Sequence, residues 1–239
     1  MAILEAEKVT KYFGGLAAMV NVDFHINQGE ILGLIGPNGA GKTTLFNLIS
    51  GALPLTSGTI KFKGENITRL APDQTCKRRV VRTFQAGNLF AKMTALDNVL
   101  LGALFGTSRG IRTPDARREA VELLEFVGLS GKEDFPANDL TLAAQKRLEI
   151  ARALATKPDL LLLDEVMAGL NPREVEQSLE LVRGMRDKGI TVFVIEHIMK
   201  AIMGVSDRVM VLHHGEKIAE GTPKEISTSE KVIKVYLGE

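Results

Sequence analysis

The chain of 239 residues carries 30 basic and 29 acidic side chains, which leaves a formal net charge of +1. A near-neutral chain has no overall field to attract nucleic acid or an anionic membrane, so any partner must be recognised locally. Hydrophobic residues make up 45% of the sequence, enough for one large core or two closely packed subdomains. The single cysteine excludes an internal disulfide, and neither a signal peptide nor an apolar run of about 18 residues is found. We therefore expect a globular, cytosolic protein that would serve a membrane only through another polypeptide.

The N-terminal third is predicted to consist of strands and one helix. The apolar runs expected to form strands are residues 3–9, 16–26 and 31–36. A helix is expected from Lys42 to about Ser50, because Gly51 and Pro54 prevent its continuation. Residues 58–67 alternate between apolar and polar side chains across a Gly-containing turn, which indicates a hairpin.

The remainder of the chain is predicted to be helical at first and then to alternate between helices and short strands. Residues 94–127 have a helical pattern interrupted by the polar loop 106–115, which indicates a helical subdomain. The elements expected after residue 140 are a helix to residue 155, a strand at 159–164, a helix at 172–188, a strand at 190–196, a short helix and a strand at 208–213. Asn171 is expected to cap the 172–188 helix together with Glu174. Such alternation is typical of a parallel sheet with helices on its faces.

The sequence GPNGAGKT matches the phosphate-binding pattern GxxxxGK[ST], and it follows an apolar strand and opens a helix. Its glycines allow backbone N–H groups to surround phosphate oxygens, and the helix N-terminus adds a partial positive charge. Lys42 would reach the outer phosphates and the Thr43 hydroxyl would bind Mg²⁺. The residues predicted to bind nucleotide here are Gly36, Pro37, Asn38, Gly39, Ala40, Gly41, Lys42, Thr43 and Thr44.

The apolar strand at 160–163 ends in Asp164 and Glu165. Such a strand could deliver one carboxylate to Mg²⁺, and the next residue could orient and deprotonate a water molecule. Alone, the pattern is more often an ordinary core strand that meets solvent. Beside a phosphate-binding loop, the interpretation as a nucleotide site is favoured.

In this order and spacing, the motifs resemble those of the ATP-binding cassette (ABC) ATPases over the whole chain. The resemblance implies an α/β P-loop NTPase fold with a small antiparallel N-terminal β subdomain and an inserted α-helical subdomain. Within a single domain of residues 1–239, we expect the nucleotide-binding core in 1–85 and 155–239 and the helical subdomain in 86–154. The cofactors implied are ATP and Mg²⁺, bound between two subunits.

The same resemblance assigns roles to further residues. Gln85 would contact the metal and the attacking water, His197 the γ-phosphate, and Phe13 the adenine ring, with Tyr12 as the less favoured alternative. Each of these residues, taken singly, also fits an ordinary loop, strand end or core position. Glu165 would be the general base. The implied metal ligands are Thr43, Gln85 and Asp164.

The segment LTLAA at 140–144 lies where the family has its LSGGQ signature, which opens a helix that faces the nucleotide of the other subunit. Thr141 keeps a hydroxyl group and a helix-capping side chain, and Ala143 keeps its N–H group, although glycine is expected at Leu142 and Ala143. We predict a working but weakened signature in which Thr141 and Ala143 contact nucleotide. We expect the added Cβ of Ala143 to cause this weakening.

A closer similarity, to the ATPases of branched-chain amino acid importers of the LivG type, comes from the segments YFGGLAA, RLEIARAL, AGLNP and KVYLGE. The implied partners are two transmembrane permease subunits, a second ABC ATPase that is a copy or a paralogue, and indirectly a periplasmic solute-binding protein. The implied location is the cytoplasmic face of the inner membrane. Val166 and Met167 depart from the usual Pro-Ala after the catalytic glutamate. The favoured function is to power the import of branched-chain or other hydrophobic amino acids. Alternatives that remain open are an ATPase for another cargo (amide, urea, or lipid or lipopolysaccharide export) and a soluble ABC ATPase acting on DNA or ribosomes, although the neutral charge disfavours the latter.

Two clusters are expected to have no chemical role. The basic residues expected to form a solvated helix face are Lys77, Arg78, Arg79 and Arg82. His213 and His214 are expected in a hairpin turn, where two imidazoles alone do not make a metal site.

Overall fold

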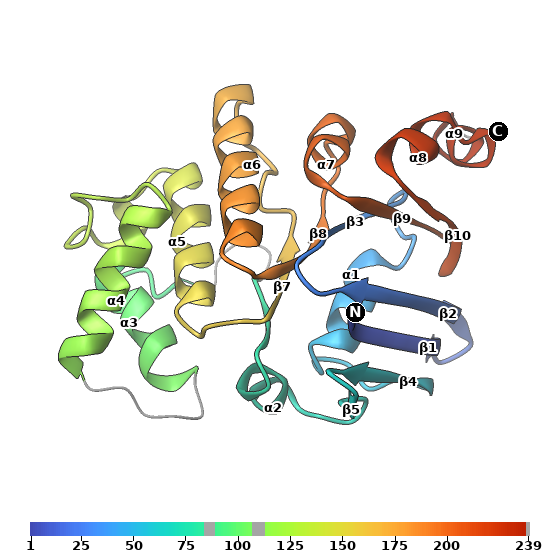
Figure 1. Cartoon of the computed structure of the whole chain (residues 1–239), viewed down its shortest axis with the longest axis horizontal. Coiled ribbons are helices and arrows are strands. Elements are labelled where there is room, and N and C mark those ends of the chain that lie inside the picture. The colour runs from blue at the N-terminus through green and yellow to red at the C-terminus, as the bar shows by residue number, and fades with distance from the viewer. Residues whose placement is uncertain (84–88, 107–112, 238–239) are drawn as a thin grey trace.

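The computed structural model describes residues 1–83, 89–106 and 113–237 (Figure 1). Gln85 lies outside the described residues. The chain forms two sheets, one antiparallel and one mainly parallel, with helices on the faces of the parallel sheet. Among the described residues, no helix combines the length and the apolar character needed to cross a membrane.

The antiparallel sheet has four strands in the order β2-β1-β4-β5. Its strands are β1 (Ala2–Phe13), β2 (Leu16–Asn27), β4 (Ser57–Phe62) and β5 (Glu65–Asn66). The predicted hairpin at 58–67 is confirmed, with Lys61 opposite Asn66. β1 is longer than expected because it stays paired with β2 as far as Phe13, through several register shifts, although its apolar alternation ends earlier.

The second sheet has six strands in the order β10-β9-β3-β8-β7-β6. They are β3 (Ile31–Ile35), β6 (Val80–Arg82), β7 (Leu160–Asp164), β8 (Thr191–Ile195), β9 (Arg208–His213) and β10 (Glu216–Gly221). All pairs are parallel except β9 with β10, so the predicted parallel sheet is confirmed. β3, β7 and β8 are buried along their whole length, which explains why their sequences are continuous apolar runs.

The helices are α1 (Lys42–Ile49), α2 (Pro72–Lys77), α3 (Ala95–Phe105), α4 (Thr113–Phe126), α5 (Leu142–Leu154), α6 (Pro172–Asp187), α7 (Met199–Val205), α8 (Pro223–Thr228) and α9 (Glu230–Leu237), with a 3-10 turn at Ala137–Asp139. α3, α4 and α5 gather on the side of the molecule away from the antiparallel sheet (Figure 1). The predicted cap of α6 is confirmed: Asn171 Oδ1 accepts from the Glu174 N–H at 3.0 Å, and the Glu174 carboxylate accepts from the Asn171 N–H at 2.9 Å.

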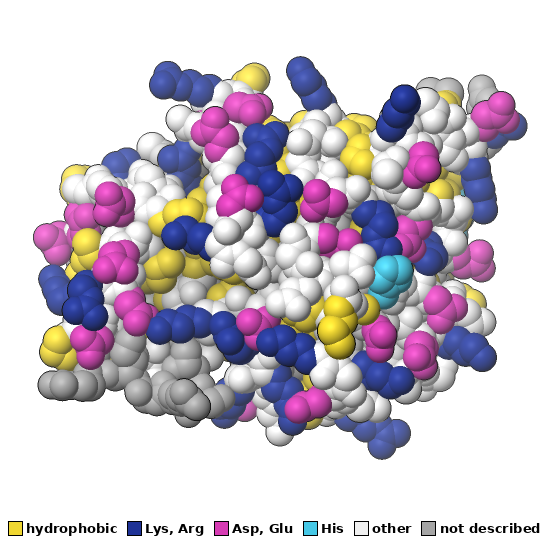
Figure 2. Space-filling view, in the orientation of Figure 1, with side chains coloured by type: hydrophobic (Ala, Val, Ile, Leu, Met, Phe, Trp, Pro, Cys, Tyr) yellow, Lys and Arg dark blue, Asp and Glu magenta, His cyan; other side chains and the backbone are white. Residues whose placement is uncertain are grey.

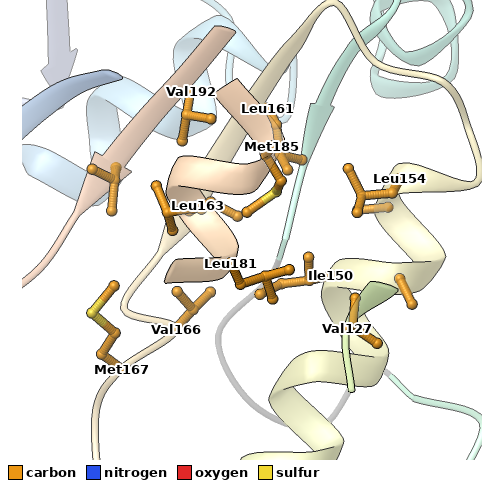
Figure 3. Close-up of a cluster of buried hydrophobic side chains, with 14 of the residues drawn as sticks. Val127, Ile150, Leu154, Leu161, Leu163, Val166, Met167, Leu181, Met185 and Val192 are labelled. Carbon is orange, nitrogen blue, oxygen red and sulfur yellow. The ribbon is translucent and has the colours of Figure 1, made fainter. Parts of the chain in front are cut away.

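The apolar core joins the helical side of the molecule to the parallel sheet. Figure 3 shows side chains from α5 and α6 directed toward the strand that ends in Asp164. The labelled side chains of this contact are Ile150 and Leu154 from α5, Leu181 and Met185 from α6, and Leu161 and Leu163 from β7. Val166 and Met167 are buried in the same core. The end of β7 therefore lies in a packed environment that both sides of the molecule help to build.

The surface of the protein carries mixed positive and negative charge. Lysine, arginine and carboxylate side chains are mixed over the face in Figure 2, as expected from a net charge of +1.

The prediction that Arg82 lies on a solvated helix face is wrong. Lys77 ends α2, whereas Arg82 is on β6, buried, and forms an ion pair with Asp164. A charged side chain can be buried in this way because an opposite charge on the neighbouring strand compensates it.

Candidate functional site

The phosphate-binding loop connects β3 to α1 and folds tightly against its surroundings. Gly36 has φ 155° and Gly41 has φ 102°, both outside the usual range of residues with side chains. A Cβ at Gly36 would lie 2.2 Å from the Leu212 carbonyl oxygen, and one at Gly41 would lie 2.9 Å from the Ala18 oxygen. Glycine is required at both positions by backbone conformation and by close packing.

Lys42 turns back over the loop. Its ammonium group donates to the carbonyl oxygens of Gly36 at 2.7 Å and Pro37 at 3.0 Å. Burial lowers the pKa of the Lys42 ammonium, and the nearby carboxylates of Glu165 and Asp164 oppose this shift. The positive charge is therefore held at the mouth of the loop, where an anionic ligand would meet it.

An open pocket of about 350 Å³ lies beside the loop. The predicted nucleotide-binding residues that line it are Asn38, Gly39, Ala40, Gly41, Lys42, Thr43 and Thr44. Glu165 and His197 line it as well, as do residues 16–18 and His214, for which the sequence predicted no part in the site. The predicted site residues of the described chain that do not line this pocket are Phe13, Gly36, Pro37, Thr141, Ala143 and Asp164.

Glu165 and His197 meet because they follow neighbouring parallel strands. Asp164 at the end of β7 is paired with Ile195 at the end of β8, and the Glu165 N–H donates to the Ile195 carbonyl at 3.0 Å. The His197 Nε2 lies 2.5 Å from Glu165 Oε1. Glu165 has φ 52°, a left-handed conformation that is uncommon for a residue with a side chain and is frequent at functional sites.

Asp164 is buried at the end of β7 beside Arg82. Its Oδ2 accepts from Arg82 Nη2 at 2.6 Å, and Arg82 also donates to Asn47 Oδ1 of α1. Burial raises the pKa of the Asp164 carboxyl, and the hydrogen bond from Arg82 opposes that shift. Asp164 Oδ1 is buried and has no hydrogen-bond partner within the part of the chain that the structure describes. An unpaired, buried carboxylate oxygen is a suitable acceptor for the hydration shell of Mg²⁺, so these residues fit the expected metal.

Glu196, between β8 and His197, was not predicted as part of the site. Only 3% of its surface is exposed, and its Oε1 accepts from the Met167 N–H at 2.7 Å. Burial raises the pKa of the Glu196 carboxyl to about 7, although the Met167 hydrogen bond and Lys146 act in the opposite direction. The only signal in the sequence is a carboxylate at the end of an apolar strand, which predicts a solvent-facing residue and not a buried one.

Phe13 and Tyr12 lie in the β1–β2 hairpin, which also supplies Leu16, Ala17 and Ala18 to the pocket. Phe13 is 45% exposed and Tyr12 is 43% exposed. The Lys11 ammonium lies 5.1 Å from the centroid of the Phe13 ring. Both rings are accessible for stacking, so the choice between them stays a prediction.

The segment 140–144 opens α5 at some distance in sequence from the pocket residues. Thr141 caps the helix, with its Oγ1 accepting from the Ala144 N–H at 3.3 Å. Ala143 is only 7% exposed, whereas Leu142 is 49% exposed. The accessible side chains at this helix end are therefore those of Thr141 and Leu142.

Comparisons with known proteins agree with this geometry. A family model described as ABC transporter matches residues 19–168, and a model described as Branched-chain amino acid ATP-binding cassette transporter matches residues 216–239. The chain is 42% identical over 240 residues to the high-affinity branched-chain amino acid transport ATP-binding protein LivG of Salmonella typhimurium, covering 95% of this chain and 94% of the relative.

Two solved structures illustrate the fold and its assembly. The ADP conformation of an ATP-binding cassette of an ABC transporter superposes with a TM-score of 0.91 at 34% identity, over 100% of both chains. A dimeric ATP-binding cassette in a post-hydrolysis state, bound to ADP and Pi, superposes with a TM-score of 0.83 at 30% identity, over 92% of this chain and 98% of the other.

Proposed function

Because the chain belongs to the ABC transporter family of ATP-binding cassettes, as its motifs predicted, we propose that it hydrolyses ATP to power the import of branched-chain amino acids. The observation that carries the catalytic part is the meeting of Lys42, Glu165 and His197 in one pocket. The similarity to LivG over nearly the whole chain supports the choice of cargo.

In this proposal the triphosphate of ATP lies along the loop from Gly36 to Thr44. Backbone N–H groups and the α1 N-terminus bind its oxygens, and Lys42 exchanges its bonds with the loop carbonyls for bonds to phosphate. Mg²⁺ would be held by Thr43 and, through Oδ1, by Asp164, and it would neutralise charge on the outer phosphates. Gln85, outside the described residues, is assigned to the same shell. Phe13 is the proposed platform for adenine.

Glu165 is the proposed general base. Its carboxylate lies at the pocket wall, where it can accept a proton from the water that attacks the γ-phosphate. His197, 2.5 Å from Glu165 Oε1, fixes the direction of that carboxylate and faces the same phosphate. These roles rest on the position of the residues at the adjoining ends of β7 and β8.

The proposed assembly contains two ATPase subunits, either two copies or a copy and a paralogue, beneath two transmembrane permease subunits. Thr141 and Ala143 of one subunit would face the nucleotide of the other. A periplasmic solute-binding protein would deliver the cargo, and the ATPase would lie at the cytoplasmic face of the inner membrane. We also propose the division into a core of 1–85 and 155–239 and a helical subdomain of 86–154, whose first boundary falls next to residues outside the described part.

The enzymatic part is tested with Glu165→Gln. The amide keeps the shape of the side chain but cannot accept the proton, so the hydrolysis rate should fall by about 10²- to 10⁴-fold while ATP still binds. ATP should then hold the variant as a dimer in size-exclusion chromatography. Glu180→Gln, on the exposed face of α6, is the matched control and should behave like the wild type. A wild-type rate in Glu165→Gln would refute the assignment of the base.

The cargo is tested in cells that lack the gene. Uptake of radiolabelled leucine, isoleucine and valine should fall, and the wild-type gene should restore it whereas Glu165→Gln should not. Unchanged uptake after the deletion would refute branched-chain amino acid import.

A further inference from the structure

Lys146 connects the helix that carries the signature segment to the backbone of the proposed base. It lies on α5, five residues after the cap residue Thr141, and its Nζ donates to the carbonyl oxygen of Glu165 at 2.8 Å. α5 belongs to the helical side of the molecule, whereas Glu165 follows a central strand of the parallel sheet. One side chain thus joins two parts of the fold at the residue on which the proposed chemistry depends.

The backbone around Glu165 is held from several directions. The Glu165 N–H donates to the Ile195 carbonyl at the end of β8, and the Met167 N–H donates to the buried carboxylate of Glu196. The Glu165 carbonyl accepts from Lys146 at 2.8 Å and from the Ala168 N–H at 3.3 Å. Glu165 also has the left-handed φ of 52°, a conformation that persists only where the surroundings impose it. Of these bonds, the one from Lys146 comes from a helix of the helical side, whereas the others come from β8 or from the segments that directly follow β7 and β8.

The positive charge of Lys146 favours a strong hydrogen bond to the Glu165 carbonyl. Its ammonium group lies near the carboxylates of Glu149 and Glu196, and it opposes the rise in pKa that burial causes in both. A charged donor forms stronger hydrogen bonds to carbonyl oxygens than a neutral one does. The position of Lys146 on α5 therefore helps to set the direction of the Glu165 carbonyl, together with the Ala168 N–H.

We propose that Lys146 is a positioning residue: it couples the placement of the signature end of α5 to the orientation of Glu165. The inference rests on the proposed function, in which the start of α5 meets the nucleotide of the second subunit. When that contact shifts the start of α5, the Lys146 ammonium changes the setting of the Glu165 peptide and so directs the base toward its water. Each subunit then reports the nucleotide of its partner to its own catalytic carboxylate.

A purely structural role would make Lys146 a tether for α5. The packing argues that α5 does not depend on such a tether, because Leu148, Ile150 and Leu154 anchor it in the apolar core. Removal of the ammonium should therefore leave the fold intact and affect the chemical step.

The first test compares three variants of α5 at saturating ATP and Mg²⁺. Lys146→Met keeps an apolar stem of similar length and removes the donor, whereas Lys146→Arg restores a charged donor. Arg147→Met is the matched control, because Arg147 is the next residue and its side chain bonds Gln177 of α6. The measurements are the single-turnover hydrolysis rate, the equilibrium affinity for ATP and the melting temperature.

Lys146→Met should reduce the single-turnover rate about ten- to a hundredfold, as expected when a reacting group is misplaced by about 1 Å, with ATP affinity within about twofold of wild type. Lys146→Arg should recover most of the rate, and Arg147→Met should stay within about twofold of the wild type. A wild-type rate in Lys146→Met would overturn the proposal, as would a loss of rate that Arg147→Met shares. Should Lys146→Met melt below the assay temperature, all variants are compared at a temperature below its melting temperature.

The second test places Lys146→Met in the Glu165→Gln background. If the lysine acts through the base, its removal should cause no further loss once the base is gone. A full ten- to hundredfold additional loss in the double variant would show that Lys146 acts elsewhere. The two proposals fail separately: a wild-type rate in Glu165→Gln alone refutes the assignment of the base, whereas additive losses refute only the coupling through Lys146.

Discussion

Replacing Glu196 with glutamine should remove a pH dependence from the stability of the fold. The Glu196 carboxyl has its pKa raised from 4.5 to about 7, with burial as the main cause. Glutamine does not titrate, yet its Oε1 can still accept the Met167 N–H bond that Glu196 accepts at 2.7 Å. The substitution therefore removes the buried charge and keeps the hydrogen bond.

The direction of the effect follows from proton binding. Between pH 4.5 and about 7, the unfolded chain has lost the Glu196 proton whereas the folded protein still holds it. The free energy of unfolding of the wild type therefore falls as the pH rises through this window, and the decrease is complete above pH 7. For these two pKa values, the contribution of Glu196 falls by about 2.5 kcal/mol between about pH 5 and pH 8.

Urea unfolding at a series of pH values measures this difference. The free energy of unfolding of Glu196→Gln relative to the wild type should rise by about 2.5 kcal/mol from pH 5 to pH 8. The charged groups that face Glu196 are Lys146 of α5 and the carboxylate of Glu165. The wild type and Glu196→Gln share both groups, so their effect cancels in the comparison. Glu180→Gln, on the exposed face of α6, should follow the wild-type curve. Parallel curves for wild type and Glu196→Gln would refute the argument that Glu196 is protonated below pH 7 in the folded protein.

Four further substitutions test other parts of the site. Phe13→Ala should weaken ATP binding by about 1 kcal/mol without changing the rate at saturation, measured by equilibrium titration, because stacking acts on the base and not on the reacting phosphate; unchanged affinity would exclude stacking on Phe13. Thr141→Val should impair ATP-driven dimerisation in size-exclusion chromatography, whereas Ala143→Gly should leave it equal or stronger. Wild-type dimerisation of Thr141→Val would show that the segment only begins a helix and has no role in nucleotide contact. Arg82→Met should lower the free energy of unfolding by about 3–5 kcal/mol, because it leaves a buried carboxylate without its cation, and a loss below about 1 kcal/mol in urea unfolding would contradict this reasoning.

Local patterns predicted most of the fold. The phosphate-binding loop is specified by residues 31–43 alone, because the strand, the glycines and the helix start are all contiguous. The meeting of Glu165 with His197 also follows from sequence once the strands before them are recognised as parallel neighbours, since their carboxyl ends lie at one edge of the sheet. Buried parallel strands are continuous apolar runs, and such runs are the easiest strands to recognise.

What the sequence did not predict depends on contacts between distant segments. β6 has only three residues, too few for a pattern, so Arg82 was assigned to a basic helix face. Its actual partner, Asp164, is 82 residues away along the chain. Glu196 was overlooked for the same reason: a carboxylate at a strand end predicts exposure, whereas this one is buried and accepts a hydrogen bond from Met167, 29 residues away along the chain. Burial of a charge is a tertiary property, which the residue and its neighbours in sequence do not determine.

The signature segment shows how a motif can lose its glycines and still open a helix. Thr141 has φ −62° and ψ 159°, the extended conformation of a helix cap, and none of residues 141–144, all within the described chain, has a positive φ. Glycine is therefore not needed here for backbone conformation, and its remaining advantage is the absence of a side chain. Ala143 is 7% exposed and Leu142 is 49% exposed, so Leu142, which lies beside Gly169, presents more side chain at this helix end than Ala143 does. The Thr141 hydroxyl is retained, as are the backbone N–H groups at the start of the helix. We therefore predict that the exposed Leu142 side chain, which stands where glycine is expected, contributes to any weakening of the signature.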